Sequence, residues 1–290
     1  MDRVAVVTDT THYLPRDLVT RLDLHQVSLY VTFEGETERE ADITDLAGFY
    51  TRLSASTEMP STSQPSVGDF LAVYEPLLGA GRDIVSIHLS AGISGTFTAA
   101  EQARDQLVER GIDSDRIVVL DSATACAGLG MLAMAAASVA RAGGSAAEAA
   151  EAAQACRRDL KVWFAVDTLE FLRRGGRIGG AQAWIGSTLK IKPILAIESE
   201  IVPIERVRTW GRAFERMVDH LRALREQGND RFFIQHIQAP DQAEKLAQRG
   251  QAIYGRPPEF VSEMGPVIGA HAGPGLIGTT ALRDELLGPV

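Results

Sequence analysis

Cysteine is scarce in this chain, and its cysteines are not paired in sequence. Among 290 residues only Cys126 and Cys156 occur, far apart and outside any C-x-x-C motif. The six histidines are equally dispersed, and none lies four positions from another. Structural zinc sites and disulfide scaffolds need such clusters, so we expect neither, and no metal or other cofactor is predicted.

Long apolar runs and an excess of basic residues are also lacking. No window reaches the roughly 18 apolar residues of a membrane-spanning helix, and the first residues lack the apolar core of a secretory signal. We therefore expect a cytoplasmic protein without membrane insertion. The 29 Lys and Arg residues are outnumbered by 38 Asp and Glu residues, which gives a formal charge of −9. Because binding to nucleic acid needs a basic surface, this balance argues against such a partner.

The chain does contain enough apolar sequence for a sizeable core. Hydrophobic residues make up 45% and charged residues 23% of the sequence, values that are typical of globular proteins. The length fits two domains of about 150 residues each or one large α/β unit.

Strand and helix patterns alternate through the first half of the chain. Short apolar runs that stop at polar residues are typical of buried parallel strands, and the amphipathic segments between them indicate helices. Strands are predicted at residues 4–7, 27–33, 84–89 and 117–120. Helices are predicted at residues 15–22, 44–53, 67–78, 94–110, 127–140 and 145–158, with a loop at 54–66. The alternation predicts a parallel sheet with helices on both faces.

The second half has a different order of elements. Residues 193–197 and 201–207 flank a short turn at 198–200, which predicts an antiparallel hairpin. Further strands are predicted at residues 162–166, 231–237 and 259–264, and helices at 212–225 and 242–254. We therefore predict an α/β fold of two domains. Residues 1–160 form an α/β domain with a parallel sheet, and residues 161–290 form an α+β domain with an antiparallel sheet.

Asp9 and Thr10 directly follow the first predicted strand. Ligands bind at the carboxyl edge of open α/β sheets, so both residues are candidates for a site. Alternatively, Asp9 or Thr11 caps the helix that begins near Pro15.

Hydroxyl groups and an amide gather in residues 61–66 (STSQPS), just before a predicted helix. Ser66 and Asp69 resemble a capping box. Thr62, Ser63 and Gln64 exceed what one cap needs, and several neutral donors near a helix N-terminus suit a carboxylate or a phosphate. Both interpretations stay open.

Residues 90–96 (SAGISGT) lie between a predicted strand and a long helix. Gly92 and Gly95 allow backbone N–H groups to approach an anion closely. The segment matches neither a dinucleotide-binding nor a P-loop motif, and it is not the G-x-S-x-G elbow of hydrolases. It is therefore an anion site or a plain helix cap.

His271 stands in the turn-rich segment 269–275 (GAHAGPG), so we expect it in a turn rather than on a packed helix face. It either bonds a nearby carbonyl or faces the head group of a ligand.

Basic residues are concentrated around a pair of glycines in the second half. They are Arg173, Arg174 and Arg177, followed by Lys190, Lys192, Arg206 and Arg208. Such a run is either a solvated face or a docking surface for an acidic partner or a phosphate-bearing ligand.

Taken together, these segments resemble the DegV family. The matching segments are residues 7–11, 62–66, 93–96, 120–122, 172–178 and 265–275, in the family's order and across nearly the whole chain. The T-S-Q-P and H-x-G-P-G pieces are specific in combination. The resemblance implies a bacterial fatty-acid-binding protein similar to the FakB subunit of fatty acid kinase. It also implies a parallel-sheet α/β domain and a second domain with an antiparallel sheet, which covers a lipid tunnel.

The resemblance also implies roles for individual residues. Thr62 and Ser94 are expected to hydrogen-bond a fatty acid carboxylate, with His271 near the head group. The positions expected to complete or support this site are Gly95, Thr96, Ser63, Gln64, Asp9 and Thr10. Arg173 matches a position associated with the kinase partner, and we extend this docking role to Arg174 and Arg177. The chain departs from the family at Thr10, where Ser is common, and at residues 91–92.

The leading hypothesis is therefore a carrier rather than an enzyme. It would bind a long-chain fatty acid in a buried tunnel and present the carboxylate to an ATP-dependent kinase, which forms acyl phosphate. One alternative is a stand-alone enzyme that uses Ser94 as nucleophile and His271 as general base on a small substrate. The other is a regulator that senses fatty acid without a kinase.

Overall fold

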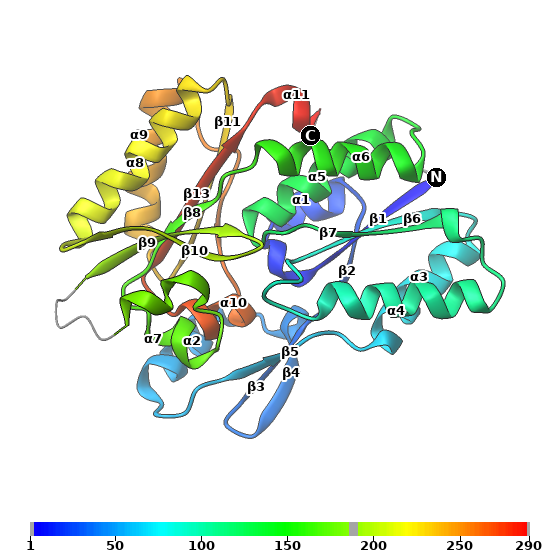
Figure 1. The fold of residues 1–290 in the computed structure, drawn as a ribbon, viewed down its shortest axis with the longest axis horizontal. Coiled ribbons are helices and arrows are strands. Elements are labelled where there is room, and N and C mark those ends of the chain that lie inside the picture. Colours follow the sequence, from blue (N-terminus) through cyan, green and yellow to red (C-terminus); the bar gives the residue numbers. More distant parts are fainter. Residues whose placement is uncertain (1–2, 186–190, 289–290) are drawn as a thin grey trace.

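Three β-sheets organise the computed structural model, which describes residues 3–185 and 191–288 (Figure 1). Two of them are built from strands before residue 122, and the third from strands after residue 162. The predicted domain boundary at residue 160 falls between these two sets of strands, and it stays a prediction.

The first sheet is parallel, as the alternation of elements predicts. Its strands, in the spatial order β2-β1-β6-β7, are Leu24–Val27, Val4–Asp9, Asp83–His88 and Ile117–Asp121. Helices α3 (Val67–Gly79) and α4 (Thr96–Glu109) pack on one face, and α5 (Ala127–Arg141) and α6 (Ala146–Asp159) pack on the other. Every residue of β1 is buried because both faces are covered, which explains the apolar run at its residues 4–7. The predicted α/β class is confirmed.

The predicted strand at 27–33 is wrong, because the chain changes sheet within it. Residue Val27 ends β2, and β3 (Tyr30–Phe33) begins a small antiparallel sheet of order β4-β3-β5. Its other strands are β4 (Glu36–Arg39) and β5 (Ser61–Ser63), with α2 (Leu46–Ala55) between them in sequence. Strand β5 lies in the predicted loop. The sequence of β5, Ser-Thr-Ser, has no hydrophobic alternation, so it is pairing with β3 that makes it a strand.

The third sheet has six strands and is mostly antiparallel. In the order β10-β9-β8-β13-β11-β12 they are Glu200–Val207, Lys192–Glu198, Trp163–Ala165, Leu276–Leu282, Arg231–Ile237 and Val261–Glu263. The predicted hairpin is present as β9 and β10, whereas β11 and β12 are parallel. Strand β13 is central in this sheet, and no strand was predicted there.

Helices cover one face of this third sheet, and the other face turns toward the rest of the molecule (Figure 1). The covering helices are α8 (Trp210–Glu226) and α9 (Pro240–Tyr254). The remaining helices are α1 (Arg16–Arg21), α7 (Glu170–Arg174), α10 (Pro266–Ala272) and α11 (Asp284–Leu287), with 3₁₀ turns at Thr10–His12, Glu40–Asp42, Ser114–Arg116 and Gly179–Trp184. Within the described residues, no helix has the length and apolar character needed to cross a membrane.

Candidate functional site

A cavity of about 430 Å³ lies where the three sheets meet. Both halves of the chain line it, with Leu29 and Leu89 from the first half and Phe164, Met264 and Leu276 from the second. The volume falls within the range of roughly 300–1,000 Å³ that is usual for small-molecule sites. The lining is mostly aliphatic and aromatic, so the cavity suits an apolar ligand.

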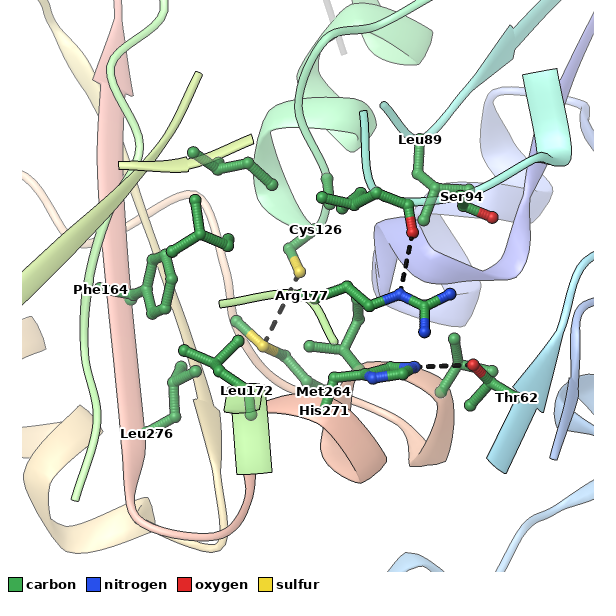
Figure 2. A pocket seen from close by; sticks show the side chains of 18 of the residues that line it. Thr62, Leu89, Ser94, Cys126, Phe164, Leu172, Arg177, Met264, His271 and Leu276 are labelled. Carbon is green, nitrogen blue, oxygen red and sulfur yellow. Dashed lines mark hydrogen bonds between the residues drawn. The ribbon is translucent and has the colours of Figure 1, made fainter. Parts of the chain in front are cut away.

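Two polar residues of the third sheet, Gln235 and Thr279, line the cavity but are hydrogen-bonded to backbone groups of the protein. The other polar side chains gather at one end. Figure 2 shows Thr62, Ser94 and His271 toward one side, and Phe164 and Leu276 toward the other. The three polar residues are partly exposed, whereas Phe164 and Leu276 are buried. A ligand with one polar group would therefore place that group at the more accessible end.

Thr62 and His271 form a direct contact at the polar end. The Oγ1 atom of Thr62 lies 2.7 Å from Nε2 of His271. Thr62 is held on β5 by its pairing with Val31. His271 occupies the last turn of α10, so the prediction that it lies in a turn is wrong. The helix begins with Pro266 and ends at Gly273, whose φ of 74° most other residues disfavour.

The imidazole of His271 is uncharged at neutral pH. Burial lowers its pKa from 6.5 to about 4, and the positive charge of Arg177 contributes in the same direction. Its Nδ1 atom is buried and has no hydrogen-bond partner within the part of the chain that the structure describes. It faces Gly175, where an added Cβ would collide with it.

The predicted anion loop after β6 reaches the same end of the cavity. Ser94 and Gly95 line the cavity together with Ser63 and Gln64. Thr96 is buried behind them, with its hydroxyl oxygen 2.9 Å from that of Ser94. The loop leads directly into α4, so free N–H groups at the start of a long helix also lie at this end.

Asp9 and Thr10 do not line the cavity. The buried Asp9 carboxylate accepts hydrogen bonds from Leu89 N at 2.8 Å and Thr11 N at 3.0 Å. Burial alone would raise its pKa, but hydrogen bonds and the charge of His88 hold the pKa below its usual value. The hydroxyl of Thr10 donates to Glu40. Both residues thus fix the edge of the sheet that carries the cavity loops.

The structure separates the three arginines of the basic segment. Arg173 and Arg174 are exposed, and both pair with Glu170, at 2.7 and 2.6 Å. Arg177 instead lines the cavity. Gly176, with a φ of 71°, turns the chain between them.

Two of the other basic residues of that region interact with neighbouring side chains. Lys192 pairs with Asp167 at 2.6 Å, and the guanidinium of Arg206 stacks over Trp184. Lys190 lies outside the described residues. The assignment of this region to partner docking stays a prediction.

The geometry does not favour the alternative of a stand-alone enzyme that uses Ser94 and His271. Ser94 and His271 share no hydrogen bond within residues 3–185 and 191–288, because His271 is bonded to Thr62 and Ser94 to Thr96. A nucleophile needs its base within hydrogen-bond reach. Nor do His, Cys, Asp and Glu gather into a group of three that could hold a metal ion in those ranges.

The residues of the apolar wall were not among the predicted site residues. Cys126 precedes α5, Phe164 lies in β8 and Met264 follows β12, and each is indistinguishable in sequence from an ordinary core residue. Gly278 is different, because a glycine in the middle of an apolar strand marks a close approach of backbone or ligand. It is the one signal that could have located this wall.

The DegV family model, described as that of an uncharacterised protein family, matches residues 3–284. Among curated proteins, Protein DegV of Bacillus subtilis is 37% identical over 278 residues, which cover 95% of this chain and 97% of the relative. A DegV domain-containing protein of Streptomyces coelicolor is 40% identical over 281 residues, covering 95% of this chain and 96% of the relative.

The chain is also similar to solved structures of DegV proteins. A structure described as fatty acid binding of a DegV family protein from Thermus thermophilus has a TM-score of 0.88 and 36% identity, covering 97% of this chain and 99% of the other. The structure of DegV from Bacillus subtilis, described as a fatty acid binding protein, has a TM-score of 0.87 and 35% identity, covering 98% of this chain and all of the other.

Proposed function

The chain belongs to the DegV family, and on that premise we propose that it binds a long-chain fatty acid in the cavity described above. The acyl chain lies along the apolar wall, and the carboxylate lies among Thr62, Ser94 and His271. The observation that carries this proposal is the polarity of the cavity, which is apolar and buried at one end and polar and partly exposed at the other.

Typical free energies indicate how much each end of the cavity contributes to ligand binding. Burying about fourteen methylenes contributes on the order of 11 kcal/mol gross, at ~0.8 kcal/mol each. Hydrogen bonds to a carboxylate contribute roughly 1.5–3 kcal/mol each before desolvation is subtracted. The tail therefore supplies most of the affinity, and the polar end fixes which way the ligand points.

Binding is tested first on the protein as purified. Native mass spectrometry is expected to detect an acyl-chain mass, and the delipidated protein is expected to bind palmitate or oleate. A purified protein without such a mass that also fails to bind either acid after delipidation would disprove the proposal.

We further propose that the protein presents the bound carboxylate to an ATP-dependent kinase, which converts it to acyl phosphate. The partly exposed polar end supports this, because a bound carboxylate there is within reach of a partner. Arg173 and Arg174 are exposed and offer a docking surface. They precede Arg177, which lines the cavity, by only a few positions in the sequence. The partner would supply the nucleotide and the metal ion.

Charge reversal tests the kinase step. The tagged chain is isolated from its native host, and ATP-dependent acyl phosphate is trapped with hydroxylamine. Arg173→Glu is expected to lose both the co-purifying kinase and the acyl hydroxamate. Arg249→Glu is the matched control, since Arg249 is also exposed and paired with a glutamate, Glu215. Fatty acid binding without any kinase or hydroxamate would instead favour the regulator.

A further inference from the structure

Arg177 is the one arginine that lines the cavity in the described part of the chain, and backbone carbonyls fix its guanidinium there. Nε donates to the carbonyl of Ile93 at 3.2 Å, and Nη1 donates to the carbonyl of Gly175 at 2.6 Å. Figure 2 shows its head group between Ser94 and His271. A guanidinium has five N–H donors, so donors remain for a ligand.

The charge of Arg177 has no carboxylate partner within 4 Å among residues 3–185 and 191–288. Its neighbours in sequence differ, since Arg173 and Arg174 are both neutralised by Glu170. Carbonyl oxygens satisfy individual N–H groups without cancelling the charge. Arg177 is only partly exposed, and a partly desolvated cation is stabilised when an anion lies beside it. The geometry therefore leaves a place for an anion.

The other groups at the polar end do not carry a full positive charge. Thr62 and Ser94 are neutral, and His271 is uncharged because burial and Arg177 lower its pKa to about 4. The start of α4 adds only a partial positive charge. Among the described residues that line the cavity, Arg177 is thus the one full cation available to a ligand head group.

We propose that Arg177 is the counter-ion of the ligand carboxylate, and that it makes the cavity select ionised fatty acids over uncharged lipids of the same length. This inference rests on the proposed fatty acid binding and deepens it. It differs from the docking role expected for Arg177 from the sequence, because the side chain lies inside the cavity rather than on the exposed face with Arg173 and Arg174.

The test compares two ligands that differ only in head-group charge. Affinities of delipidated protein for oleate and for oleyl alcohol are measured at pH 8 for wild type, Arg177→Gln and Arg177→Lys. Wild type is expected to prefer oleate. Because hydrogen bonds to charged groups contribute about 1.5–3 kcal/mol, Arg177→Gln is expected to weaken oleate binding about 10- to 100-fold and to leave oleyl alcohol nearly unchanged. Arg177→Lys is expected to retain part of the preference, and the exposed Arg249→Gln all of it.

Three other results would overturn the inference, and they are distinguishable. If Arg177→Gln keeps the wild-type affinity for both oleate and oleyl alcohol, Arg177 is not the counter-ion even though fatty acid binding stands. If both ligands weaken equally, Arg177 has only a structural role. If the wild type binds neither ligand, the proposed fatty acid binding fails, and the inference fails with it. Both affinities are measured on the same sample of each variant. A partial loss of folded protein therefore reduces the binding of both ligands alike and does not produce the expected change in their ratio.

Discussion

The side chains of Thr62 and His271 meet at 2.7 Å although 209 positions separate them in the chain. One is on the edge strand of the small antiparallel sheet, and the other is at the end of a short helix beyond β12. The polar end of the cavity therefore forms only when the two halves of the chain are packed together. Substitutions at residues that line the cavity near this contact are therefore expected to change ligand affinity.

Replacing Thr62 by Val removes the hydroxyl and leaves Nε2 of His271 without its partner. Losing one hydrogen bond to a charged ligand costs about 1.5–3 kcal/mol, so oleate affinity is expected to fall at least about tenfold. Thr62→Ser should restore most of it. Thr37→Val, at an exposed position of β4, is the matched control for calorimetric titration. Wild-type affinity in Thr62→Val would remove Thr62 from the site.

Gly95 is packed against the side chain of Gln64, and an added Cβ would collide with its amide group. Gln64 is exposed and can move, so Gly95→Ala is expected to change folding stability little. The displaced amide alters the polar end, and oleate affinity should fall by roughly 2- to 10-fold, the effect of one hydrogen bond.

A double-mutant cycle checks this cause. In a Gln64→Ala background the collision is absent, so Gly95→Ala should have no further effect on titrated oleate affinity. Gly79→Ala is the control, since an added Cβ there meets nothing within 4 Å. Equal losses in both backgrounds would mean that Gly95 acts independently of Gln64.

Gly278 lies on the apolar wall, opposite Phe164 across the β13–β8 pair. An added Cβ would make only ordinary contacts, the nearest at 3.5 Å to Phe164 Cβ, so Ala fits and a larger side chain enters the cavity. Excluding two methylenes of the ligand costs about 1.6 kcal/mol, or roughly 15-fold in affinity. Gly278→Leu is therefore expected to weaken stearate binding by at least that factor and laurate binding far less.

The two ligands serve as each other's control within one protein sample. Gly278→Ala should keep the wild-type ratio of stearate to laurate affinity, and Gly278→Val offers an intermediate side chain should the Leu variant fail to fold. An unchanged ratio in both larger variants would show that the acyl chain does not pass Gly278.

The sequence was sufficient to predict the elements whose pattern is local. The α/β class and the hairpin at β9 and β10 were predicted because buried strands and amphipathic helices carry their own periodicity. Strand β5 could not be predicted, since Ser-Thr-Ser has no such periodicity and its pairing with β3 is a tertiary interaction. Strand β13 was missed where Gly278 interrupts its apolar run.

Residue patterns marked the polar segments of the candidate site with alternatives left open, and only the family resemblance assigned them to one head group. Thr62, Ser94 and His271 were expected at one head group, and the structure does place all three on one cavity. The position of Arg177 could not be predicted, because Arg173, Arg174 and Arg177 are equivalent in a charge pattern. The turn at Gly176 directs Arg177 into the cavity and leaves the other two outside.

Three histidines make the unliganded protein sensitive to mild acid. Burial lowers the pKa of His12, His220 and His271 from 6.5 to about 4. Between these values the unfolded chain binds protons that the folded chain does not. The free energy of unfolding is therefore expected to be unaffected by these groups above about pH 6.5 and to fall as the pH drops toward 4. One such group contributes a slope of at most about 1.4 kcal/mol per pH unit.

His220 allows this to be tested away from the cavity. Its ring stacks on Trp163 with centroids 4.1 Å apart, and its Nε2 lies 3.1 Å from the carbonyl of Lys161. His220→Gln removes one titrating group, so urea unfolding of the delipidated variant between pH 7.5 and 5 should show a shallower fall of the free energy of unfolding below pH 6.5, by at most about 1.4 kcal/mol per pH unit. The variant has lower stability at pH 7.5, since the stacking is lost, but the difference from wild type narrows in acid. Parallel curves for the two proteins would mean that His220 is protonated in the folded state as readily as in the unfolded chain.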